Sequence, residues 1–76
     1  MSQLSKEDKI QIISSHKRNL EYRKYGLELD KLQENAKATP NTDLISTFQS
    51  SIAEIEDQVA VLDQELASVN ALAEEE

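Results

Sequence analysis

The sequence predicts an all-α protein, in which two long helices form an antiparallel coiled-coil hairpin that bundles into a homo-oligomer. The chain of 76 residues contains one glycine and one proline, and good helix formers such as Ala, Leu, Glu, Lys and Gln dominate the rest. Its clearest turn signal lies near the middle, at "ATPNT". We therefore expect a single hairpin domain, with helix one over about residues 5–37, a turn over about 38–41 and helix two over about 40–73.

The first helix has both a start signal and a stop signal. Ser5 opens an S-x-x-D capping box with Asp8, and Glu7 complements the positive end of the helix dipole. The residue before a proline disfavours the helical region, so this helix should end shortly before Pro40. Thr39 suits the N-cap of the second helix and Pro40 its first position, where the missing N–H costs nothing.

The second helix carries the strongest periodic signal in the chain. Its apolar residues alternate at steps of three and four, which is typical of a coiled-coil seam. An amphipathic helix lying on a globular core is the alternative, but so short a chain has no other core to offer. The mixture of apolar residue types does not select two, three or four strands. The predicted helix-two seam consists of Ile45, Phe48, Ile52, Ile55, Val59, Leu62, Leu66 and Val69.

Charge indicates what this seam meets. All eight Lys and Arg residues lie at or before Lys37, whereas the rest of the chain is acidic and contains no base. A parallel copy of helix two would bring Glu56, Asp63 and Glu65 to the seam edges without a base to meet them. Folding helix one back on helix two joins unlike charges, although each exposed pair contributes only ~0.2 to 1 kcal/mol. The sign of the charges favours a hairpin.

Helix one has apolar residues on two faces. One face continues the alternation of three and four, and we expect it to form the helix-one seam against helix two: Tyr22, Tyr25, Leu29, Leu32 and Ala36. The other face lies nearly opposite and is the expected oligomer or partner face: Ile10, Ile13, Leu20 and Leu27. Either Gly26 breaks the helix and realigns the faces, or the helix is continuous and one face meets a neighbouring subunit. We favour the continuous helix, because a mid-helix glycine costs only ~1 kcal/mol.

No motif indicates catalysis, a cofactor or a metal site. Cysteine and a glycine-rich phosphate loop are absent, and His16 has no second histidine with which to bind a metal. The bases around Lys17 and Lys24 alternate with acids along the helix, a pattern that argues against nucleic-acid binding. The longest apolar run is far shorter than the ~20 residues of a membrane span, and the first residues lack the apolar core of a signal peptide. We expect a non-enzymatic cytoplasmic protein without a cofactor.

The run "SHKRNLEYRKYGLELDKLQENAKATP", residues 15–40, resembles small uncharacterised α-helical proteins of tailed phages, especially those that infect marine cyanobacteria. In size, helicity and acidic C-terminal part, the chain is also similar to the class of helical chaperones that assist phage tail-fibre assembly. The resemblance implies a virion component or an assembly helper, located in the host cytoplasm or the virion, and it implies no site residues.

Two functions of different class follow. The first is a structural or assembly protein that associates with itself and with another protein. The second is a small acidic regulator or inhibitor that binds a host protein through Glu54, Asp57 and Glu65 on the outer side of helix two.

Overall fold

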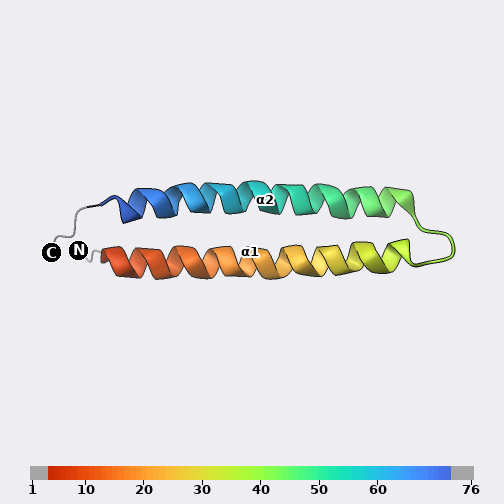
Figure 1. Cartoon of the computed structure of the whole chain (residues 1–76), viewed down its shortest axis with the longest axis horizontal. Coiled ribbons are helices and arrows are strands. Elements are labelled where there is room, and N and C mark those ends of the chain that lie inside the picture. Colours follow the sequence, from red (N-terminus) through yellow and green to blue (C-terminus); the bar gives the residue numbers. More distant parts are fainter. Residues whose placement is uncertain (1–3, 73–76) are drawn as a thin grey trace.

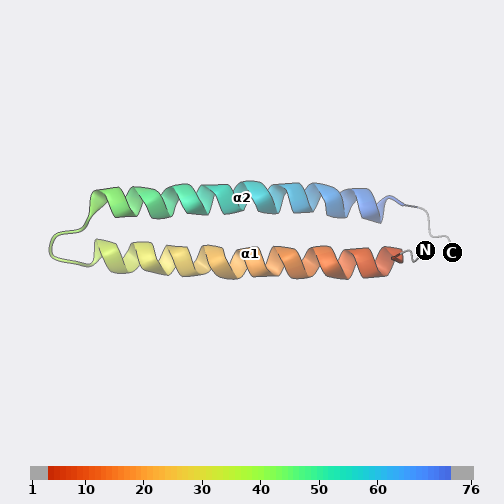
Figure 2. The same ribbon diagram turned by 180° about the vertical axis from the view of Figure 1, so that it is seen from behind.

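The computed structural model describes residues 4–72 and consists of two long helices packed side by side (Figure 1 and Figure 2). Helix α1 spans Lys6–Asn35 and helix α2 spans Thr42–Asn70. The helices run in opposite directions and are joined by a short turn at one end of a molecule measuring 60 × 18 × 14 Å. Residues 4–72 contain no strand, so the predicted all-α hairpin is confirmed.

α1 begins at the capping signal. The Oγ of Ser5 accepts a hydrogen bond from the backbone N–H of Asp8 at 2.9 Å, and the Ser5 N–H donates to the Asp8 carboxylate at 3.4 Å. These bonds satisfy two of the donors that a helix N-terminus leaves without partners. α1 then continues through Gly26 without interruption to Asn35, so the glycine does not realign the two apolar faces.

α2 begins slightly later than the "ATPNT" signal predicts. Its N-cap is Asn41, whose Oδ1 accepts a hydrogen bond from the Leu44 N–H at 3.1 Å. Thr39 and Pro40 therefore lie in the turn that precedes the helix. The prediction extended helix two to about residue 73; α2 ends at Asn70, and residue 73 lies outside the described residues.

The core is a thin seam between the two helices. Its buried apolar residues are Ile13 from α1 and Ile52, Ile55 and Val69 from α2. None of the described side chains is completely enclosed, because two helices can cover each other on one side only. A domain of this size buries only ~60% of its unfolded surface, so much apolar surface stays exposed.

Candidate interaction site

α2 presents one nearly continuous apolar face to α1. All eight residues of the predicted helix-two seam are buried or half-buried, and Ile52, Ile55 and Val69 are the most enclosed. Ala53 and Ala60, on the outer side of the helix, are exposed. The face follows from the heptad spacing, because steps of three and four keep side chains on one side of a helix.

α1 meets α2 with the residues that the sequence analysis assigned to the oligomer or partner face. Ile13 is buried, and Ile10, Leu20 and Leu27 are half-buried against α2. The prediction was therefore wrong for the α1 half of the seam. The physical reason is length: this face runs along the whole of α1, whereas the tyrosine face covers only its second half. Two helices that pack side by side along their whole length need contact faces of similar length.

Three lysines at steps of seven alternate with these apolar residues, and we call them the lysine row: Lys17, Lys24 and Lys31. Their partners on α2 also lie at steps of seven, in the reverse direction: Asp63, Glu56 and Gln49. The Lys17 Nζ lies 2.8 Å from an Asp63 oxygen, and the Lys24 Nζ lies 3.2 Å from a Glu56 oxygen. The hydrogen bond to Asp63, together with its negative charge, raises the pKa of Lys17. The lysine row thus matches the basic helix to the acidic helix in one register.

The second apolar face of α1 is exposed, and its Leu32 lies at the edge of a groove that α1 forms with Gln49 and Ile52 of α2. We call it the outer stripe, and it consists of Tyr22, Tyr25, Leu29, Leu32 and Ala36. Both tyrosines are 61% exposed and Leu32 is 64% exposed. The predicted packing of this face on α2 is therefore wrong, and the outer stripe is an apolar ridge on the outside of the hairpin. Steps of three and four keep its members in line.

Arg18 covers the first tyrosine of the outer stripe. Its guanidinium carbon lies 5.1 Å from the centre of the Tyr22 ring, and its Nε donates a hydrogen bond to the Tyr22 hydroxyl at 3.2 Å. A cation over an exposed aromatic ring contributes ~0.5 to 1 kcal/mol. The contact fixes the Tyr22 ring at the N-terminal end of the outer stripe.

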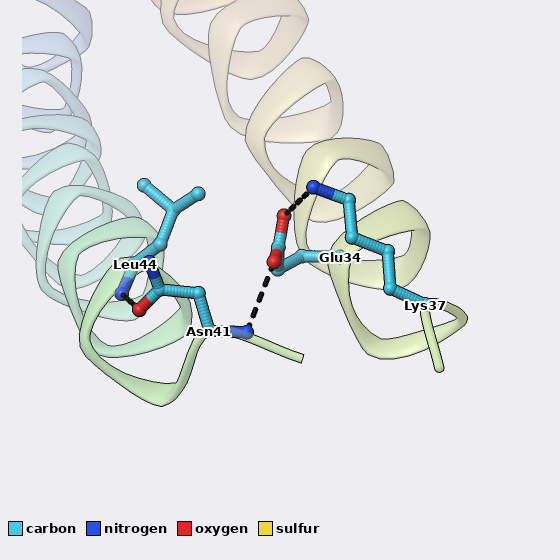
Figure 3. Close-up of polar contacts among 4 residues, drawn as sticks. All are labelled: Glu34, Lys37, Asn41 and Leu44. Atoms are coloured by element: carbon cyan, nitrogen blue, oxygen red, sulfur yellow. Dashed lines mark hydrogen bonds and ion pairs between the residues drawn. The ribbon is translucent and has the colours of Figure 1, made fainter. Parts of the chain in front are cut away.

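A buried carboxylate links the two helices at the turn. Glu34 is only 6% exposed, and its two oxygens have different partners (Figure 3). One lies 2.9 Å from the Lys37 Nζ, and the other accepts a hydrogen bond from the backbone N–H of Asn41 at 3.0 Å. The bond from Lys37, followed by the bond from Asn41, lowers the pKa of Glu34. This link could not be predicted from the sequence, because Glu34 and Lys37 form an ordinary pair three residues apart and the Asn41 N–H reaches Glu34 only when the chain reverses.

The remaining polar residues lie apart from one another. His16, Glu54 and Asp57 are exposed on the outside of the hairpin. Over residues 4–72, no group of three or more His, Cys, Asp and Glu side chains is placed to bind a metal ion. In the same part of the chain, neither helix combines the length and the apolar character that crossing a membrane requires.

Comparison with known proteins gives no relative: no protein-family model, curated protein or solved structure matches the chain.

Proposed function

We propose that this chain is a non-enzymatic helical-hairpin protein that associates with itself and has a structural or assembly role. The observation that carries the proposal is the outer stripe, an exposed row of two tyrosines and two leucines with coiled-coil spacing. The inner face of α1 is already occupied by α2, so the outer stripe is available to a further helix.

Burial of the outer stripe would supply stability that one hairpin lacks. Removing apolar surface from water contributes ~25 cal/mol per Å², and aromatic side chains bury the largest areas. The hairpin itself has four buried apolar residues among those described, which is a small core. Small domains with such cores commonly gain their stability from oligomerisation.

An assembly role agrees with two further features. Residues 15–40 resemble small helical proteins of tailed phages, which favours a virion component or an assembly helper in the host cytoplasm or the virion. The acidic outer side of α2 stays free when the outer stripe is occupied, so a second protein can bind there. The proposal therefore includes one partner of each kind, another copy of the chain and a different protein.

The test is the solution mass as a function of concentration, measured by sedimentation equilibrium. The wild-type chain should move from 8.6 kDa towards a multiple of that mass as its concentration rises. Tyr25→Lys should hold the protein at the monomer mass, because it places a charge in the outer stripe. Val61→Lys is the matched control, since Val61 is also 61% exposed but lies on α2. A wild-type chain that stays monomeric at every concentration would contradict self-association.

A second candidate function is a small acidic regulator that binds a basic protein. α2 has no basic residue within its bounds, and Glu54, Asp57 and Glu65 are exposed without an ion-pair partner in the described part of the chain. Replacing all three by Gln, Asn and Gln should leave helicity and mass unchanged. The regulator is favoured if the wild-type chain captures a basic protein from a host lysate and the neutral variant does not.

A further inference from the structure

A groove lies beside the seam on one side of the hairpin, and we call it the Gly26 groove. It has a volume of about 410 Å³. The side chains and backbone that form its two walls are Arg23, Gly26 and Asp30 from α1, and Ser51, Glu54 and Gln58 from α2. A Cβ added to Gly26 would meet nothing within 4 Å, so the hairpin does not require a glycine there. Glycine is unfavourable in the middle of a helix, and its effect here is to keep the α1 wall of the groove low.

The outer stripe is a ridge on the same chain, and a ridge of side chains packs into a groove. We propose that the outer stripe of one copy lies in the Gly26 groove of a second copy, with the docked α1 antiparallel to the α1 that forms the groove wall. This inference rests on the proposed self-association and names the surface that receives the outer stripe. The two contact surfaces are different parts of the chain.

Charged residues repeat at steps of seven on both edges of α1. Arg23 lines the Gly26 groove, and His16 lies seven residues before it on the same edge. Glu28 lines the groove on the other side of the hairpin, and Glu21 lies seven residues before it. None of these four side chains has an ion-pair partner among the described residues. One edge of α1 is thus basic, and the opposite edge is acidic.

Antiparallel docking brings the acidic edge of one copy onto the basic edge of the other. When Glu21 of the docked copy lies level with Arg23, a step of seven along both helices brings Glu28 of the docked copy level with His16, whose ring N–H can donate to a carboxylate. Parallel docking with Glu21 level with Arg23 would instead bring Glu28 level with Asp30. Unlike charges across an interface fix its register, and like charges weaken it. The charges therefore select the antiparallel orientation.

The same register places a large side chain of the docked copy opposite Gly26. Arg18 of the docked copy comes level with Gly26, where the missing side chain leaves room for the guanidinium group. Lys24 pairs with Glu56 within the hairpin, so Gly26 is also level with Glu54 on the other wall of the groove. Glu54 is exposed and has no ion-pair partner in the described part of the chain. The docked Arg18 thus meets an unlike charge across the open part of the groove.

The register also covers exposed apolar surface on both copies. Leu32 of the docked copy, which is 64% exposed in the single hairpin, comes level with Ile12, which is 45% exposed. Ile12 and His16 line one shallow hollow, so Ile12 lies along the basic edge of α1. Removal of these side chains from water favours the docked state.

Contact between two different surfaces has a consequence for the size of the assembly. A two-fold dimer uses the same surface on both copies, whereas this contact leaves one outer stripe and one Gly26 groove free at the ends. Further copies can add there. The mass of the wild-type chain should therefore continue to rise with concentration beyond that of a dimer.

Complementation between two blocked variants tests the geometry. Tyr25→Lys places a charge in the outer stripe, and Glu54→Arg places a base in the groove where Arg18 of the docked copy lies. Each variant alone should associate roughly tenfold more weakly than the wild type, because every contact between copies needs both surfaces. In an equimolar mixture, the intact outer stripe of the Glu54→Arg copy fits the intact groove of the Tyr25→Lys copy. Sedimentation equilibrium should show one heterodimer and no larger species.

Asp57→Arg is the matched control, because Asp57 is a second exposed acid of α2 that does not line the groove. It should associate like the wild type, and the three variants should keep the helical circular-dichroism signal of the wild type. A Glu54→Arg variant that associates as tightly as Asp57→Arg would overturn the inference. A mixture of Tyr25→Lys and Glu54→Arg that stays monomeric would also overturn it.

Exchange of one charge pair tests the register. Arg23→Glu and Glu21→Lys should each weaken association about fivefold, because each brings like charges together at every contact between copies. The double variant should recover most of the loss, since the pair is then restored with its charges exchanged. Sedimentation equilibrium at low salt measures all three. A double variant that associates no more tightly than the single variants would contradict the proposed register.

Cross-linking locates the docked helix directly. The docked α1 runs parallel to α2 of the second copy, so Ser15 comes level with Ser51 when Arg18 comes level with Glu54. The chain has no cysteine, and Ser15→Cys copies should join Ser51→Cys copies under mild oxidation. Ser50→Cys is the matched control, because Ser50 is exposed and does not line the groove. A Ser15→Cys copy that joins Ser50→Cys in preference to Ser51→Cys would overturn the inference.

The outcomes separate the two proposals. A wild-type chain that remains at 8.6 kDa contradicts self-association and this geometry together. A wild-type chain that associates, and whose Glu54→Arg variant associates equally well, contradicts the geometry alone.

Discussion

The two helices of the hairpin distribute their apolar residues differently. α2 places most of its large apolar residues on the single face that meets α1. α1 divides its apolar residues between an inner face, which it shares with the lysine row, and the exposed outer stripe. A helix with one apolar face needs one partner, whereas a helix with two apolar faces has surface for a second. α1 is therefore the helix through which we expect this protein to associate.

The lysine row explains how α1 packs on α2 with so few apolar residues. The methylene groups of a lysine can cover apolar surface while its ammonium group remains at the edge. Lys17 and Lys24 are about one-third exposed, and their ammonium groups reach Asp63 and Glu56. The inner face of α1 thus combines packing with charge pairing, and α2 supplies most of the buried apolar side chains.

A charge placed in the α2 seam should have the largest effect on the stability of the hairpin. Ile55 is only 3% exposed, so Ile55→Asp places a charge in the thin core and should destabilise the hairpin by about 3–5 kcal/mol. This is a large part of the stability of a small domain, and the helical circular-dichroism signal should collapse at moderate temperature. Ala53→Asp is the control, on an exposed position of the same helix. An Ile55→Asp variant with the same melting temperature as the Ala53→Asp variant would contradict the burial of the α2 seam.

Reversal of one ion pair should have a smaller effect. Lys24→Glu places a carboxylate beside Glu56, and we expect a loss of roughly 1 kcal/mol, because both side chains of the pair are partly exposed. Adding Glu56→Lys should recover most of this loss, since the pair is then restored with its charges exchanged. Denaturant unfolding of the wild type, both single variants and the double variant measures the coupling. Strictly additive effects would mean that the lysine row does not set the register.

Acidification should have the smallest effect on the stability of the hairpin, and it should act through the carboxylate of Glu34 at the turn. The pKa of Glu34 is lowered in the folded state, so the unfolded chain takes up its proton first as the pH falls. The stabilisation by Glu34 is complete above its ordinary pKa of 4.5 and is lost as the pH falls through the lowered value. Glu34→Gln should therefore flatten the acid side of the melting-temperature curve, whereas the exposed control Asp57→Asn should not. Parallel curves for wild type and Glu34→Gln would contradict this role.

The sequence predicts the second helix better than the first, and the reason is physical. The heptads from Ile45 to Val69 form one unbroken face, so periodicity alone indicates what is buried. In α1 two apolar faces compete, and the alternation of three and four from Tyr22 to Ala36 predicted that the wrong face meets α2. The ion pairs of Lys17 with Asp63 and of Lys24 with Glu56 show which face of α1 meets α2. They form because the bases on α1 and the acids on α2 both repeat at steps of seven, and the two helices run in opposite directions.

Contacts at the turn follow from geometry that no local pattern specifies. Glu34 is buried because the chain reverses beside it and brings the Asn41 N–H within 3.0 Å of its carboxylate. Pro40 signalled the break between the helices, but it did not indicate that Asn41 would be the N-cap. The outer stripe was visible in the sequence as an apolar face, and only the packed hairpin shows that α2 leaves it exposed.

The central claim is that α1 uses Leu27 for the hairpin and Leu32 for a second copy. The most direct test compares Leu27→Asp with Leu32→Asp, with helicity and solution mass measured on the same samples. We predict that Leu27→Asp lowers the melting temperature of the monomer, whereas Leu32→Asp leaves the monomer helical and abolishes the rise in mass with concentration. The opposite result, an unfolded Leu32→Asp and a folded, associating Leu27→Asp, would show that the tyrosine face packs on α2 and would contradict this account.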